Sequence, residues 1–136
     1  MASYRHLIRI CLMQTIFAIE FKQQDSHIVL ERILKEFAPK VEDLDFAYQS
    51  IDGVMKNRQE ILDIISRYAP EWPVEKIARI DRAILEVGIY EIAFSNEVPP
   101  VVAINEAIEI AKEYGDNSSP KFVNGVLSSV MKDYAK

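Results

Sequence analysis

Cysteine is almost missing from this sequence, since Cys11 is the only one among 136 residues. A single thiol cannot form an internal disulfide, which excludes a disulfide-stabilised scaffold and agrees with a reducing compartment. Cys11 stands beside Ile8 and Leu12 in an apolar helical segment. We therefore expect a buried structural thiol and not a reactive one.

Long apolar runs are missing as well. No run approaches the roughly 20 residues that a membrane-spanning helix needs, and Arg5, His6 and Arg9 interrupt the apolar segment near the N-terminus. Neither a membrane span nor a secretory signal is predicted. We expect a cytoplasmic protein without a membrane partner.

An excess of positive charge is also missing, because 16 basic and 21 acidic side chains give a net charge of −5. A general nucleic-acid binder draws its affinity from a broad cationic surface, and this composition excludes one. Any RNA site must be local. Such a site is expected to bind weakly alone or to need a basic partner.

Catalytic motifs are the fourth absence. The sequence contains no glycine-rich phosphate loop, no zinc spacing, and no serine or cysteine beside a candidate base. An acidic row at Glu106, Glu109 and Glu113 could suggest a di-iron bundle, but neither His6 nor His27 supplies the Glu-x-x-His motif. We interpret the row as a solvated helix face and predict a protein that is not an enzyme and has no metal and no cofactor.

Helical periodicity is what the sequence has in abundance, and it predicts an all-α single domain, residues 1–136. The segment 79–94 is apolar almost all round, as in a buried central helix. Spacing of three and four residues predicts helices at 3–21 and 26–37, and one long helix over 42–68 or two broken near Gly53 or Asn57. Phe37 is assigned to the buried face of the second helix.

The boundary between an N-terminal half (1–70) and a C-terminal half (71–136) is predicted at the proline-flanked stretch 69–73, where Trp72 should dock into the junction. A short helix from Pro73, the central helix, a helix ending before Gly115 and a last helix from Pro120 complete a fold of about seven helices in two packed halves. We expect a left-handed cap conformation at Gly115 and a close backbone approach at Gly125.

Two groups of basic and aromatic residues could hold single-stranded RNA, which binds through cations on phosphate and aromatic rings on bases. The first comprises Arg5, His6 and Arg9 with Phe17. The second is Lys121 with Phe122, near Asn124 at the edge of the last helix. The alternative from the residues alone is that these are solvated charges beside core aromatics.

Two ordered stretches carry a family resemblance. These are Val98-Pro-Pro-Val-Val-Ala-Ile-Asn-Glu-Ala-Ile-Glu-Ile-Ala-Lys-Glu-Tyr-Gly115 and Ser119-Pro-Lys-Phe-Val-Asn-Gly-Val-Leu127. With Arg5, Arg9, Gln14 and Phe17 in the first half, the sequence resembles the NusB family of bacterial transcription antitermination factors. The resemblance implies a non-enzymatic adaptor that works with the small-subunit ribosomal protein NusE and with the RNA polymerase antitermination complex. Together with NusE it would hold the single-stranded boxA element of nascent RNA.

The resemblance also implies site residues. RNA contacts fall on Arg5, His6, Arg9, Phe17, Lys121, Phe122 and Asn124, and contacts with NusE fall on Phe17, Asp81 and Arg82. The chain departs from the family pattern in a thinner basic cluster, a phenylalanine where tyrosine is common at 17, and an acidic Glu86 where a basic residue is common. These departures concern RNA affinity more than fold.

Two alternatives stay open from the sequence. One is a helical protein-interaction or homodimerisation module without RNA binding, since the first helix is apolar on two sides. The other is a stand-alone relative of the domain that is fused to ribosomal-RNA cytosine methyltransferases.

Overall fold

A computed structural model describes residues 2–134, and within them every regular element is a helix. The prediction of an all-α fold is therefore confirmed. The α-helices are α1 (Ala2–Phe21), α2 (Ser26–Phe37), α3 (Asp45–Lys56), α4 (Arg58–Tyr68), α5 (Arg79–Ile89), α6 (Pro100–Tyr114) and α7 (Ser119–Tyr134). A short 3-10 helix, η1 (Val74–Lys76), precedes α5, and a π-helix, η2 (Tyr90–Phe94), follows it.

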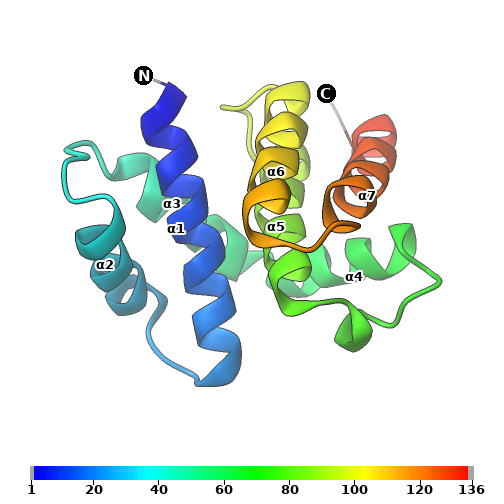
Figure 1. The fold of residues 1–136 in the computed structure, drawn as a ribbon, viewed down its shortest axis with the longest axis horizontal. Coiled ribbons are helices and arrows are strands. Elements are labelled where there is room, and N and C mark those ends of the chain that lie inside the picture. The colour runs from blue at the N-terminus through cyan, green and yellow to red at the C-terminus, as the bar shows by residue number, and fades with distance from the viewer. Residues whose placement is uncertain (1, 135–136) are drawn as a thin grey trace.

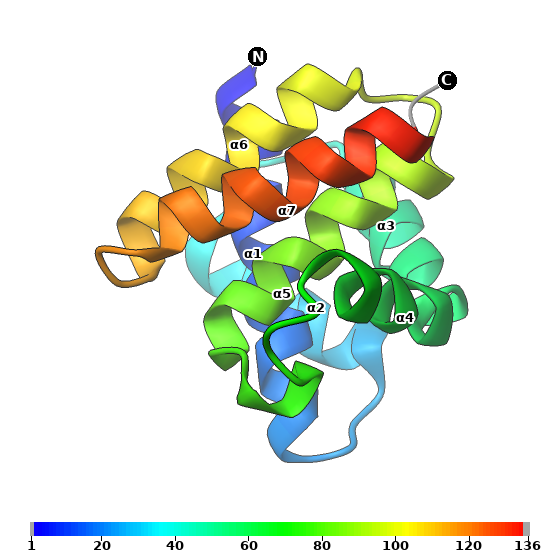
Figure 2. The same cartoon turned by 90° about the vertical axis from the view of Figure 1, so that its right-hand side faces the viewer.

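The helices are arranged around α5, as Figure 1 shows. Helices α1, α2 and α3 lie on one side of the molecule, and α6 and α7 pair on the other. Turned by 90°, the molecule shows α5, α7 and α6 running side by side along roughly the same diagonal, with α4 to the right of α5 (Figure 2). All nine residues from Asp81 to Ile89 are buried, as predicted for a central helix.

Local sequence signals explain where several helices begin. The Asp25 carboxylate accepts hydrogen bonds from the backbone N–H groups of His27 at 2.9 Å and Ile28 at 3.2 Å, as expected of an N-cap. Asp116 does the same before α7, accepting from the N–H groups of Ser118 and Ser119. Asn57 separates α3 from α4, so the predicted alternative of two helices is correct.

Other local expectations are wrong. Gly115 has an extended backbone with φ −92° and ψ −170°, not a left-handed one. A Cβ atom added at Gly125 would meet no other atom within 4 Å, so no backbone approaches closely there. Phe37 and Trp72 were expected to be buried, but they are 51% and 55% exposed. The π-helix was not predicted, since its widened turn (Ser95 N–H to Tyr90 C=O, 3.0 Å) leaves no periodic signal.

The buried central helix carries a charge that needs a partner. Glu86 is fully buried, and the Arg58 guanidinium of α4 binds it with an Nε–Oε1 distance of 2.9 Å. Arg58 also contacts Glu20 of α1. Oε2 of Glu20 in turn pairs with Nη2 of Arg82 at 2.9 Å. Burial raises the pKa of Glu86, and the Arg58 guanidinium opposes that rise. This cluster joins α1, α4 and α5.

Replacing Arg58 with methionine should destabilise the protein strongly, because it removes the main counter-charge of a buried carboxylate. The expected loss in free energy of unfolding at pH 7 is about 3–5 kcal/mol by urea denaturation. The folded-state pKa of Glu86 is already raised above its ordinary value of 4.5, and loss of Arg58 removes the group that opposes this rise, so the pKa in the variant is higher still. As the pH falls from 7, the buried carboxyl of the variant takes up a proton before that of the wild type does, and the loss relative to wild type should therefore shrink.

The control is the double variant Arg58→Met/Glu86→Gln. It also removes the unpaired buried carboxylate and should recover part of the lost free energy of unfolding. If Arg58→Met alone were as stable as the wild type at pH 7, Arg58 would not be the main counter-charge of Glu86.

Gly53 permits a close contact between α3 and η2. A Cβ atom at this position would overlap the ring of Tyr90. Alanine normally stabilises a helix interior by about 1 kcal/mol over glycine. Gly53→Ala should instead destabilise by about 1–3 kcal/mol, because the Tyr90 ring must move. Gly125→Ala is the matched control and should raise the melting temperature. If both variants raised the melting temperature equally, the Tyr90 ring would move aside without cost.

Candidate functional site

The first basic group lies at the start of α1, and its three members differ in exposure. Arg5 is exposed, with its Cζ 4.2 Å from the centroid of the Phe46 ring, a cation–π distance. His6 is partly exposed, and its Nδ1 lies 3.1 Å from Glu106 Oε1 on α6. Arg5 thus offers its charge to solvent, whereas His6 is held by an acidic neighbour.

Arg9 was predicted among the RNA-contacting residues of the first basic group, but its side chain is buried. The residue is 4% exposed. Its Nε lies 2.9 Å and 3.1 Å from the two carboxylate oxygens of Glu91 on η2, and its Nη1 lies 3.1 Å from Glu106 Oε1. Burial raises the pKa of Glu91, and the Arg9 guanidinium opposes the rise. Arg9 is therefore the counter-charge of a buried carboxylate.

The acidic row on α6 also differs from the expectation. Glu106 is 24% exposed in its side chain and bound by both His6 and Arg9, so it is not a freely solvated carboxylate. Glu109 and Glu113 are exposed, and Glu109 pairs with Lys112 at 3.2 Å. Among the described residues no group of three or more histidine, cysteine or acidic side chains could hold a metal ion.

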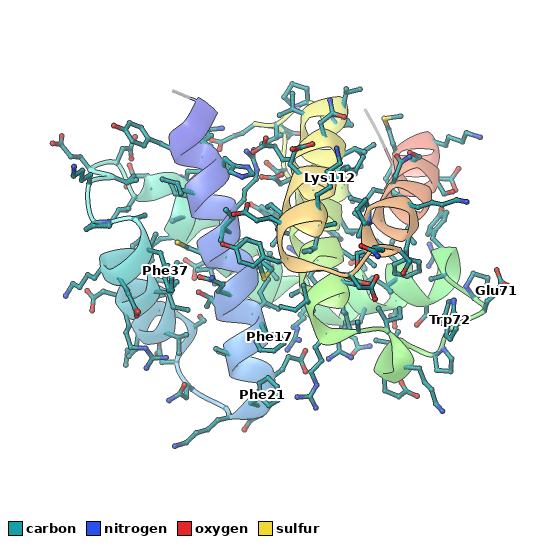
Figure 3. The ribbon with its side chains drawn as sticks, in the orientation of Figure 1. Phe17, Phe21, Phe37, Glu71, Trp72 and Lys112 are labelled. Atoms are coloured by element: carbon teal, nitrogen blue, oxygen red, sulfur yellow. The ribbon has the colours of Figure 1, made fainter. Side chains whose placement is uncertain are left out.

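An aromatic cluster lies at the other end of α1, where Figure 3 labels Phe17 and Phe21. The two rings meet edge to face at a centroid distance of 4.9 Å. Cζ of Arg79, the first residue of α5, lies 4.2 Å from the centroid of the Phe21 ring, which is 62% exposed. Phe17 was predicted as a site residue, but Phe21 and Arg79 were missed. Their spacing along the chain carries no signal, since α5 begins far from α1 in sequence.

Asp81 and Arg82, expected at a partner surface, are buried. They are 7% and 9% exposed. Arg82 donates from Nη1 to the backbone carbonyl of Val74 at 3.2 Å, and its Nη2 pairs with Glu20 at 2.9 Å. It thereby ties η1 and α1 to α5. Both residues lie beneath the surface and do not form it.

The second basic group lies at the start of α7. Lys121 is exposed, and Phe122 is half-buried against the core. Asn124 is exposed and its Oδ1 accepts a hydrogen bond from the Ser128 hydroxyl at 2.9 Å. Lys121 and Phe122 have the exposure that the prediction requires.

A pocket of about 410 Å³ lies between η1, the first turn of α5 and the first turn of α7, and we call it the α5–α7 pocket. Its lining consists of Trp72, Lys76, Ile77, Ala78, Asp81, Ser118, Lys121 and Phe122. Exposed side chains of Trp72, Lys76 and Lys121 surround it, and Figure 3 shows Trp72 at the outer edge of this region. Trp72 and Lys76 were not among the predicted site residues, because they precede α5 in a turn without periodicity.

One polar atom of this pocket's lining lacks a partner. Oδ1 of Asp81 is buried and accepts no hydrogen bond in the structure. Burial raises the pKa of the Asp81 carboxyl, while the nearby Ser119 hydroxyl lowers it and Asp116 raises it further. Because this oxygen is buried, it is shielded from solvent and does not face the open part of the pocket.

A second pocket, of about 480 Å³, surrounds Arg5 at the start of α1. Its lining contains Arg5 and Lys40 but also Glu42 and Asp43. The mixed charge makes it less suited to a phosphate backbone than the rim of the α5–α7 pocket, where Lys76 and Lys121 stand together.

The fold does not bring the two predicted basic groups together. Helices α1 and α6 begin at the same end of the molecule, and α7 begins at the opposite end (Figure 1). His6 meets Glu106 in the middle of α6, whereas Lys121 follows the turn after α6 ends. From Glu106 to Tyr114 alone the helix rises about 12 Å.

Reactive chemistry has little support in this arrangement. Cys11 is 1% exposed, and burial raises the pKa of its thiol to about 11, which leaves it protonated at neutral pH.

None of the helices within residues 2–134 is long and apolar enough to span a membrane.

Comparison of the sequence with known proteins finds relatives over almost its whole length. The model of the NusB family matches residues 6–132. The transcription antitermination protein NusB of Dehalococcoides mccartyi strain CBDB1 is 38% identical over 135 residues, covering 99% of this chain and 94% of the relative. That of Herpetosiphon aurantiacus is 37% identical over 132 residues, covering 95% and 90%.

Solved structures agree. The structure of T. maritima NusB superposes with a TM-score of 0.89 at 36% identity, covering 97% of this chain and 93% of that one. A crystal structure of antitermination factors NusB and NusE in complex with dsRNA has the same fold, with a TM-score of 0.85 at 23% identity and coverage of 98% and 100%. The chain belongs to the NusB family.

Proposed function

We propose that this protein is an RNA-binding adaptor of transcription antitermination and ribosomal-RNA synthesis. With NusE, a small-subunit ribosomal protein, it holds the single-stranded boxA element of nascent RNA for the RNA polymerase antitermination complex. Family membership supports the role. The observation that carries it is the end of the molecule where exposed Lys76, Lys121 and Trp72 surround a pocket beside Phe122.

The RNA strand contacts Lys121, Phe122 and Asn124 at the start of α7 and extends toward Arg5 and His6. Lysine and arginine neutralise phosphates, and an aromatic face stacks on a base. Arg9 acts differently from the other basic residues of α1, because it is buried against Glu91 and Glu106. It positions Glu106, and through it His6, and makes no phosphate contact itself.

NusE contacts the aromatic cluster of Phe17, Phe21 and Arg79. An exposed phenylalanine capped by an arginine is typical of protein interfaces, which are enriched in aromatic residues and arginine. Arg82 and Asp81 support this surface from below. A basic partner also suits a chain with a net charge of −5, since it adds the cationic surface that this chain lacks.

The adaptor works by binding alone, without enzymatic activity and without a cofactor. Its carboxylates are either exposed or paired with arginines, apart from Asp81, and its one thiol is buried. The role places it in the cytoplasm, with RNA polymerase.

The second candidate is a protein-interaction or homodimerisation module without RNA binding. The observation that favours it is the exposed apolar surface at Phe21, next to a surface with few free cations. Light scattering and RNA titration of the same sample separate the two candidates. A dimer that binds no RNA with or without NusE would favour the module.

Lys121→Ala should weaken RNA binding evenly across sequences, because the ammonium contacts phosphate. In a salt series measured by fluorescence anisotropy, the slope of log affinity against log salt should fall by about 0.7 for one lost contact to a single strand. Lys35→Ala on the exposed side of α2 removes the same charge and is the control. If both variants change the slope equally, the effect is one of net charge and not of this site.

Phe122→Ala should lower RNA affinity through lost stacking, worth about 1–3 kcal/mol. Some stability is lost too, since the ring is half-buried. Phe37→Ala on α2 removes an exposed ring far from the site (Figure 3) and should leave RNA binding unchanged. Normal binding by a Phe122→Ala protein in the presence of NusE would place the RNA elsewhere.

A further inference from the structure

We propose that Arg82 is a positioning residue, which couples the aromatic cluster at the end of α1 to the segment 70–76. NusE bound on the cluster would fix the last turn of α1 and, through Arg82, the segment that carries Trp72 and Lys76. The inference rests on the proposed function and assigns a regulation to it.

The first step concerns the two contacts of the Arg82 guanidinium. Nη2 lies 2.9 Å from Oε2 of Glu20 in the last turn of α1, and Nη1 donates to the backbone carbonyl of Val74 in η1 at 3.2 Å. The nitrogens of a guanidinium are held in one rigid plane. A displacement of the Glu20 carboxylate is therefore passed to Val74 through a side chain that is only 9% exposed.

The second step concerns how the segment 70–76 is held. Within residues 2–134 its backbone hydrogen bonds are local, and they join Trp72 to Ala69, Lys76 to Pro73 and Ile77 to Val74. In this described part of the chain, the bond from Arg82 to Val74 is the one hydrogen bond that connects the segment to a more distant element. The flanking residues Ala69 and Ile77 are buried, and Val74 packs against the core. The segment is therefore a surface loop that is fixed at its ends and, in the middle, by Val74 and Arg82.

The third step concerns the last turn of α1, which the partner would order. This turn carries Glu20 but no basic residue, so its charge opposes the negative end of the helix dipole. Arg58 and Arg82 hold the turn through Glu20. Arg79 lies over the exposed ring of Phe21.

Helix ends are the part of a fold that opens most easily, so the last turn of α1 has an ordered and a frayed arrangement. Coupling between two surfaces requires such an element. A partner that covers Phe21 would stabilise the ordered turn and thereby fix Glu20. Arg82 would then hold the segment 70–76 in place. Figure 3 labels both ends of this path, with Phe21 at the end of α1 and Trp72 in the segment.

The experiment titrates the full chain with NusE and records the emission of Trp72, the only tryptophan of the chain. A Trp72→Phe protein gives the background from NusE. Wild-type emission should change, and the change should saturate together with binding, which is followed by the anisotropy of labelled NusE. No RNA is present, so this titration reports on the partner surface and the segment alone.

Arg82→Lys keeps the positive charge, but one ammonium replaces a fork with two separate donors. The variant should bind NusE within about fivefold of the wild-type affinity and show about half of the emission change or less. Glu20→Gln interrupts the path on the α1 side, keeps the shape of the side chain and should lose a similar part of the emission change. Arg32→Lys makes the same exchange at an exposed position on α2 and should keep the whole change.

The consequence for function is measured as the gain in RNA affinity that NusE gives. In the wild type this gain should be about tenfold, which is within the usual range for two coupled sites. In Arg82→Lys it should fall to about threefold or less, while the affinity of the free chain for RNA stays the same.

A thermal melt shows whether each variant is folded, and Glu20→Gln carries the test if Arg82→Lys is not. Constant wild-type emission while NusE binds overturns the inference, although the proposed function survives. A full emission change in both variants also overturns it, since NusE would then act on Trp72 directly. An unchanged gain in RNA affinity in Arg82→Lys overturns the regulation. If NusE does not bind at all, the proposed function fails together with the inference.

Discussion

The structure depends on the burial of α5, and burial is costly for the acidic side chains that the segment 79–94 carries. Glu86 is fully buried and Glu91 is 2% exposed. A carboxylate removed from water must be paired or protonated. Arg58 meets Glu86 from α4, and Arg9 meets Glu91 from α1. These two ion pairs are directional, unlike apolar contacts, and they fix how α1 and α4 lie against the central helix.

The same constraint changes the distribution of free charge on the surface. Arg9 stands one turn after Arg5 in sequence, and the two look equivalent, but only Arg5 is exposed. His6 is engaged by Glu106. The start of α1 therefore presents less free positive charge than its sequence suggests. Exposed cations lie instead at the end of η1 and in the first turns of α5 and α7, at Lys76, Arg79 and Lys121.

This distribution gives the proposed adaptor a physical rationale. A chain with a net charge of −5 cannot hold RNA through general attraction, so its site must combine a few cations with stacking and shape. The α5–α7 pocket supplies aromatic walls and two rim lysines. The exposed ring of Phe21, capped by Arg79, offers a contact for a basic partner that would complete the cationic surface.

The sequence by itself determined the helices and the central position of α5, because apolar spacing, proline positions and Asp25 and Asp116 as caps act within a few residues. It also placed Lys121 and Phe122 off the apolar stripe of α7, and the structure leaves the first exposed and the second half-buried. It could not determine that Arg9, Asp81 and Arg82 are buried, or that Trp72 stays exposed. Those outcomes depend on which helices face them, and residues such as Arg9 and Glu91 are 82 positions apart. Only the tertiary structure could decide which charges neutralise each other inside and which are left for a ligand, since pairing depends on distance in space and not along the chain.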